Sequence, residues 1–291
     1  MEKKHRIHWK RGLEITPEIF VASDEYHIAE RELISLLLSS RFYGVLPESK
    51  FFIEKEIIGN SLVVNNLNCF AMTREGTVIS IPKETRFNKE LSLSEAMGNE
   101  CYVVLSVNPK GKIPEDDGAP FIYPDYYLSF VNTSESVERG MPILKIKNNN
   151  YWEIDNNYLP PSVALNSLEK LFHVFVEIRS IINKIIEKYP EKNIHFFQLE
   201  MLQLELNSFT PKKFPEELAL LMKKFCKIFY SHLISEKKLT NKELMKNFME
   251  ETFNPNEIEK FFKLGWGCFE EINTFFDAKP VDDIPILEIK V

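Results

Sequence analysis

The apolar residues of this chain change their spacing at Pro160-Pro161, and this change limits the folds open to it. Upstream, short runs of β-branched and aromatic residues alternate with turn residues, as in half-buried strands. Downstream, apolar residues recur every three or four positions, as in amphipathic helices. Neither proline has a backbone N–H donor, so regular structure is not expected to continue through them. The sequence predicts an α+β protein, mainly β over residues 1–160 and all-helical over residues 161–291.

The β half contains six candidate strands, and Glu75-Gly76 and the Asn148–Asn150 run are the candidate hairpin tips between them. One helix is predicted near residues 17–39, where apolar residues recur at helical spacing without a glycine. We expect its apolar stripe to lie on the sheet. The expected architecture is a β-sandwich or barrel. The candidate strands are Ser61–Phe70, Val78–Pro82, Tyr102–Val107, Tyr126–Val131, Ile143–Lys147 and Tyr151–Ile154.

The helical half is predicted to be an up-and-down bundle of four or five helices. Its first apolar stripe runs from Leu168 to Tyr189 and stops at Pro190. Residues 284–291 alternate like a short strand. Four later helices are predicted to begin near Asn193, Pro215, Thr240 and Asn254. Proline marks the second of these starts, and capping-box spacing marks the third and fourth.

Charge and hydropathy exclude several classes of function. Lys and Arg number 36 against 43 Asp and Glu, a net charge of −7, so no basic face for nucleic acid is expected. Residues 33–38 are among the longest apolar runs, far below the ~18 residues that cross a bilayer, so we expect no membrane insertion. The four cysteines are too widely spaced for a disulfide framework or a metal knuckle, and we expect reduced thiols in a cytoplasmic protein.

No catalytic or metal-binding motif is recognisable. The six histidines lack the spacing of a zinc site, and no GxSxG elbow is present. The acidic pairs Asp116-Asp117 and Asp282-Asp283 are chemically suited to a hard cation, but we interpret them as solvated loops. We therefore predict a non-enzymatic protein without cofactor or metal. A hydrolase that uses Asp116 or Asp117 is the enzymatic alternative.

An aromatic cluster at residues 121–127 suggests a second kind of function. Tyr and Phe rings stack on sugars and on partner prolines. We interpret the cluster as core residues on either side of a turn at Pro124. The alternative is a phage-tail-like or carbohydrate-binding adhesion module that uses Tyr123, Tyr126 and Tyr127.

Nine residues without reactive groups lie where the chain is expected to change direction. They combine large aromatic anchors, permissive glycines and prolines that enter or end an element. Such positions are held by packing, as an assembly module requires. These joint or partner-binding candidates are Trp9, Gly12, Pro17, Phe20, Tyr43, Gly44, Tyr158, Pro160 and Pro161.

The order of these residues resembles TssK, the baseplate subunit family of the bacterial type VI secretion system. The family's opening W-x2-G-x4-P-x2-F, its Tyr/Trp-Gly-Val block after the first helix and its domain junction are similar to segments between residues 8 and 162. The matching residues are Trp9, Gly12, Pro17, Phe20, Tyr43–Val45, Met141–Leu144, Trp152, Asp155 and residues 158–161.

The resemblance implies a β-sandwich shell domain, similar to the shoulder of phage receptor-binding proteins, followed by a bundle through which three copies associate. It implies a structural baseplate component, a homotrimeric adaptor that assembles in the cytoplasm at the inner membrane and binds TssF- and TssG-like wedge subunits. In the family a further C-terminal domain contacts the cytoplasmic part of the membrane complex. Since the sequence ends at Val291, we expect that domain to be missing or reduced to Asp283–Val291.

Trimerisation also accounts for apolar residues on more than one side of the predicted helices. A helix facing one core needs a single stripe, whereas residues 168–186 and 194–209 carry more. Obligate oligomers bury ~2,000 Å² or more, mostly apolar, at such faces. The trimer-interface candidates are Phe172, Phe175, Ile182, Phe196, Phe197 and Leu202.

Overall fold

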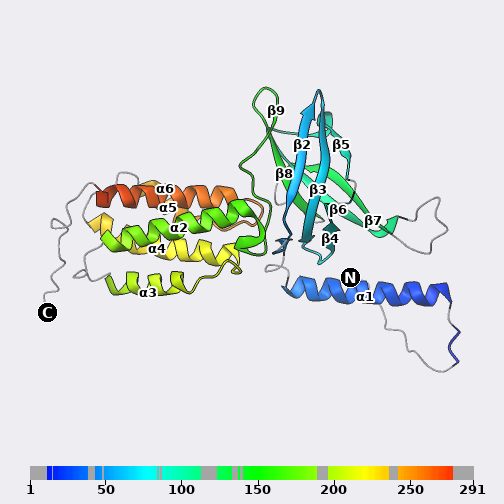
Figure 1. The fold of residues 1–291 in the computed structure, drawn as a ribbon, viewed down its shortest axis with the longest axis horizontal. Helices are drawn as coiled ribbons and strands as arrows, with labels where there is room; N and C mark the ends of the chain where they lie inside the picture. The colour runs from blue at the N-terminus through cyan, green and yellow to red at the C-terminus, as the bar shows by residue number, and fades with distance from the viewer. Residues whose placement is uncertain are drawn as a thin grey trace.

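The computed structural model describes residues 12–38, 43–112, 123–132, 137, 140–188, 196–235 and 242–277, apart from positions 15, 48, 84 and 86. Two antiparallel β-sheets come first and a bundle of helices follows (Figure 1). The predicted α+β fold class is confirmed. The last strand ends at Ile154 and the first bundle helix begins at Glu169, with Pro160-Pro161 between them.

The first sheet is organised around one long strand. In the described residues, β3 (Ser61–Met72) pairs with β1 (Gly44–Val45), β2 (Phe52–Ile58), β4 (Val78–Ile81) and β5 (Lys89–Ser92). Leu62, Val64, Leu67, Cys69 and Ala71 of β3 are buried, in the alternation that a half-buried strand requires. Sequence patterns missed β1, β2 and β5. The Glu-Lys-Glu centre of β2 hides its period, and charged residues are common on an edge strand.

The second sheet has the order β7-β6-β8-β9, with β6 at Glu100–Lys112, β7 at Tyr123–Val131, β8 at Met141–Asn148 and β9 at Trp152–Ile154. The two central strands are buried on both faces: residues 101–106 and 141–146 are all buried. One face meets the first sheet in the core of the sandwich. On the other face, Tyr102 and Val104 pack with Val137 and Tyr158. The second sheet is therefore the layer that meets the helical half.

The predicted N-terminal helix is present as α1 (Pro17–Leu38). None of the side chains described in this helix, at residues 17–28, is buried. Phe20 is 56% exposed, and Figure 1 draws α1 as a rod beside the β-domain. The packing of its apolar stripe on the sheet stays a prediction, because the side chains of Leu33, Leu36 and Leu37 lie outside the described residues.

The helical half comprises α2 (Glu169–Lys188), α3 (Phe196–Asn207), α4 (Pro215–Ser235), α5 (Lys242–Glu250) and α6 (Ile258–Asp277) among the described residues. Phenylalanines dominate its core, and Phe225 contacts both Phe229 and Phe269. Gly265 lets α6 approach closely, since a Cβ there would lie 2.4 Å from Met222 Cε. The strand-like segment 284–291 lies outside the described residues.

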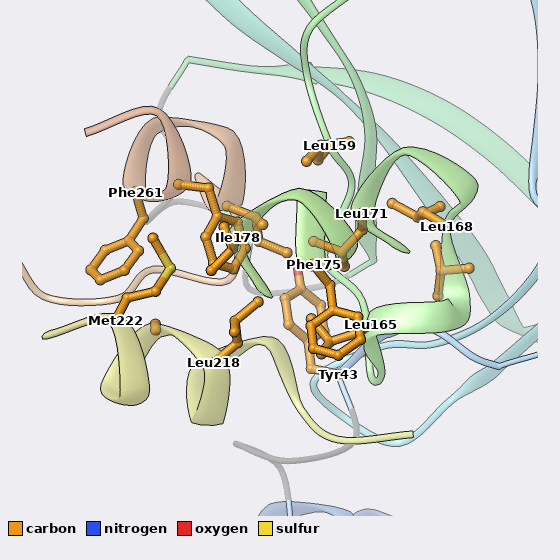
Figure 2. Packing of buried hydrophobic residues seen from close by; sticks show 14 of the residues in the cluster. Tyr43, Leu159, Leu165, Leu168, Leu171, Phe175, Ile178, Leu218, Met222 and Phe261 are labelled. Carbon is orange, nitrogen blue, oxygen red and sulfur yellow. The ribbon is translucent and has the colours of Figure 1, made fainter. Parts of the chain in front are cut away.

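One hydrophobic core runs through both halves. Figure 2 shows where they meet: Tyr43 and Leu159 lie beside Leu165, Leu171 and Phe175 at the start of the bundle. All five side chains are at most 6% exposed. The β-domain and the bundle are therefore joined by shared apolar packing as well as by the linker.

Candidate interaction site

The predicted joint residues at 43–44 and 158–161 come together where the two halves meet. Val45 and Ser162 form an isolated parallel bridge. The Val45 N–H donates to Pro161 O at 2.7 Å, and the Val163 N–H donates to Val45 O at 2.9 Å. Gly44 has φ +121°, and a Cβ on it would lie 2.4 Å from the Pro161 carbonyl carbon. Only glycine fits this position, because both the conformation and the space exclude a side chain.

Two tyrosines connect the β-domain to the start of α6. The Tyr43 hydroxyl donates to Asn256 Oδ1 at 2.8 Å, and Tyr102 donates to Glu257 Oε1 at 3.2 Å. Tyr43 and Asn256 are almost fully buried. Burial raises the pKa of the Tyr43 hydroxyl well above its usual range, so it remains a donor. Buried polar groups that satisfy each other in this way select one arrangement of the two halves.

The rim of this junction is charged. Lys145 Nζ lies 2.7 Å from Glu100 Oε2, and Lys147 Nζ lies 2.9 Å from Asp155 Oδ2. Glu259, in the first turn of α6, has one carboxyl oxygen, Oε2, that is buried without a hydrogen-bond partner. Burial raises the pKa of the Glu259 carboxyl to about 7, although backbone N–H groups and Lys145 act in the opposite direction.

Sequence patterns did not find Tyr102, Lys145 or Glu259. These residues lie on β6, β8 and α6, and no local spacing links them. One signal was present: the capping-box spacing of Asn254 and Glu257 predicted the helix start from which Glu259 projects. The helix itself begins at Ile258, because the Asn254 side chain accepts the Asn256 N–H at 3.0 Å and forms a turn ahead of it.

The N-terminal candidates do not take part in the joint over the described residues. Gly12 has φ +83° and open space around it, and Pro17 begins α1. The Phe20 side chain is exposed. Trp9 lies outside the described residues.

The trimer-interface candidates fall into two groups. Phe175, Ile182 and Leu202 are buried in the chain's own core, so their side chains have no surface left for a second copy. This corrects the expectation for these three. Phe172 is partly exposed and Phe197 is 68% exposed. The Phe196 side chain lies outside the described residues.

Helix α3 is apolar on two opposite sides. Leu199, Leu202 and Leu206 are buried against the bundle. At about 100° per residue, Phe197, Met201 and Leu204 lie within about 60° of one another on the opposite side, and all three are more than half exposed. We call these three residues the α3 outer stripe. Sequence analysis anticipated a surplus apolar face on this segment, and Phe197 is the trimer-interface candidate that lies on the α3 outer stripe.

The first sheet also has apolar side chains on its outer face. Phe52 pairs with Asn68, Phe70 with Ser80 and Val78 with Met72, so the register brings Phe52, Phe70 and Val78 onto one face. All three side chains are exposed. We call them the β outer patch.

The tyrosine cluster has a structural role where it is described. The Tyr126 hydroxyl accepts the Ser80 N–H at 3.2 Å and donates to Ser80 O at 3.0 Å, so it ties β7 to β4. Tyr127 is exposed. The side chain of Tyr123 lies outside the described residues.

No metal site is found in the part of the chain that the structure describes. That part holds no group of three His, Cys, Asp or Glu side chains placed for a metal ion. Asp116-Asp117 and Asp282-Asp283 lie outside it. Among the described helices, none combines the length and apolarity needed to span a membrane.

The chain is a two-sheet β-domain continuous with a helical bundle, and both carry exposed apolar side chains of the kind that mark contacts with other proteins. No family model and no curated protein matches the sequence. Solved structures do match, and they are TssK structures and type VI secretion baseplate complexes.

A chain of the TssK-TssF-TssG baseplate subcomplex of a type VI secretion system aligns with 96% of this chain and 100% of its own length, at TM-score 0.63 and 12% identity. A crystal structure of TssK aligns with 98% of this chain and 71% of its own, at TM-score 0.63 and 11% identity. TssK from EAEC, bound to a nanobody, aligns with 88% and 68%, at TM-score 0.59 and 12% identity. The chain therefore has the fold of TssK over nearly its whole length, and the predicted resemblance is confirmed for the fold.

Proposed function

We propose that this chain is a non-enzymatic structural component of a type VI secretion baseplate, a homotrimeric adaptor that links wedge subunits to the rest of the machine. The observation that carries the proposal is the fold match through both halves, which extends over the full matched chain of a TssK-TssF-TssG subcomplex. A fold shared only in the sandwich would leave the function open, since sandwiches serve many purposes.

Self-association is assigned to the α3 outer stripe. A helix that is apolar on two sides needs a packing partner on each side, and the bundle provides one of them. Val176 of α2 and Leu220 of α4 are also exposed on the helices that pack against α3. We assign the packing partner of the other side to a second copy of the chain.

Light scattering on the purified chain tests self-association. Phe197→Ser with Leu204→Ser should shift the trimer to monomer, whereas Lys246→Ser, at an exposed position on α5, should leave the trimer intact. A trimer that survives the double substitution would place the interface elsewhere. A wild-type chain that stays monomeric at high concentration would contradict the homotrimer.

Wedge binding is assigned to the β outer patch. Three exposed apolar side chains on one sheet face form a surface of the kind that marks contacts with other proteins. Capture of TssF- and TssG-like proteins encoded in the same genome should weaken with Phe52→Ser. Glu153→Ser, at an exposed position on β9 of the second sheet, is the control. Equal capture by both variants would remove the patch from the proposal.

Assembly at the cytoplasmic face of the inner membrane follows from this role. Contact with the membrane complex stays a prediction, since the segment 283–291 to which it was assigned lies outside the described residues. The carbohydrate-binding alternative stays a prediction: the Tyr126 hydroxyl is bound to the Ser80 backbone, whereas Tyr127 is exposed.

A further inference from the structure

The carboxyl group of Glu259 lies in the junction between the linker and the bundle, beside residues of β6 and β8. It projects from the first turn of α6, beside Ile258, which is fully buried. The Leu159 N–H of the linker hydrogen-bonds to this carboxyl group. Its Oε2 atom is shielded from solvent and has no hydrogen-bond partner. The free-energy cost of burying an ionised carboxylate in this position is only partly offset by hydrogen bonds.

Charged groups from each neighbouring element face Glu259, but the two cations are already paired. Lys145 of β8 is bound to Glu100, and Lys147 of β8 is bound to Asp155, which follows β9. Tyr102 of β6 and Tyr158 of the linker also face it. Glu257, two residues earlier, adds a further carboxylate that accepts the Tyr102 hydroxyl. The surroundings therefore provide no dedicated counter-ion for a charged Glu259.

We propose that the junction between the β-domain and the helical bundle is a proton-sensitive coupling, closed most tightly when the Glu259 carboxyl carries its proton and looser once that proton is released. Opening the junction would separate α6 from Leu159 and expose the carboxyl group to water. The closed form favours the neutral acid, whereas the open form accommodates the carboxylate without cost.

The sign of the effect follows from proton linkage. The closed junction raises the pKa of Glu259 from the ordinary value of 4.5 to about 7, mainly through burial. Below both values the two forms are protonated alike. Between them the ratio of closed to open junction falls by up to about tenfold per pH unit as pH rises. Above pH 7 the ratio stays at its lower value. The coupling is therefore most responsive to pH between about 4.5 and about 7.

Two spin labels on the full chain measure the coupling. Met97→Cys lies in the β-domain and Glu187→Cys near the end of α2, both exposed, while the native cysteines that would compete are all buried. Inter-label distances are recorded at about pH 5.5, where the closed form is still largely protonated, and at about pH 8.5, above both pKa values. A narrow distribution at the lower pH that broadens at the higher pH is expected. An unchanged distribution would overturn the proposal.

Variants separate the carboxyl group from general effects of pH. Glu259→Gln should keep the narrow distribution at both pH values, and Glu177→Gln, which removes the charge of an exposed carboxylate on α2, should behave like the wild type. If Glu259→Gln broadens as the wild type does, the proposal fails. If that variant does not fold, the carboxyl carbon of Glu259 in the wild type is followed by NMR. Titration near pH 7 supports the proposal, and titration near 4.5 overturns it.

Discussion

Alanine at Gly44 should cost ~3–5 kcal/mol of unfolding free energy, because both the backbone conformation and the space around this position require glycine. A non-glycine residue at φ +121° is strained by ~1–3 kcal/mol. The new Cβ would also lie 2.4 Å from the Pro161 carbonyl carbon and 2.5 Å from Ser162 N, both backbone atoms that cannot rotate away. The chain must separate there, which weakens the Val45–Pro161 and Val163–Val45 hydrogen bonds, at ~1 kcal/mol each.

Urea unfolding of the full chain measures this cost, and Gly59→Ala is the matched control. Gly59 has φ +60°, also left-handed, but a Cβ there meets nothing within 4 Å. Gly59→Ala should lose only the free energy that backbone strain costs, ~1–2 kcal/mol. Equal losses for the two variants would refute the steric part of the reasoning and, with it, the close approach of Gly44 to Pro161.

Three further predictions concern the joint, its rim and the core. Tyr43→Phe should cost ~1–2 kcal/mol, since the Asn256 oxygen is left buried without its donor, and in a double-mutant cycle with Asn256→Ala the two losses should not add. Burial alone would raise the pKa of the Asp155 carboxyl, but Lys147 and a backbone N–H bring it below the ordinary value of 3.8. The stabilisation that Asp155 contributes is therefore complete above pH 3.8 and is lost as the pH falls below that value. The cost of Asp155→Asn, followed by unfolding at a series of pH values, should therefore vanish in strong acid, and a cost that persists there would contradict the ion pair. Burial raises the pKa of the Cys69 thiol to about 12, and all four thiols are buried, so iodoacetamide should label none until the chain unfolds; labelling of the native chain would show an open core.

The sequence predicted those parts of the fold that rest on local pattern. The period change at Pro160-Pro161 separated strands from helices, and glycine and asparagine marked the hairpin tips. β2 was missed because its charged centre gives no strand period. α1 was recognised from its spacing, but spacing says nothing about which surface covers a helix, and Phe20 turned out to be exposed.

In the candidate site, too, local pattern reveals some residues and misses the contacts that only the fold creates. Gly44 and Pro161 are recognisable as joint residues because glycine and proline reveal backbone requirements locally. Their pairing across more than a hundred residues is a property of the fold alone. Phe175 and Phe197 look alike as apolar residues of amphipathic segments, yet one is buried in the bundle and the other faces out. Periodicity cannot separate a core stripe from an interface stripe on a helix that carries both.

Native mass spectrometry of the chain, co-expressed with the TssF- and TssG-like proteins of its own genome, tests the assembly role most directly. The chain alone weighs 34.1 kDa. The account predicts a species of three times that mass when the chain is purified by itself, and a heavier complex in which such trimers are joined to wedge subunits. A 34.1 kDa species in both samples would contradict it.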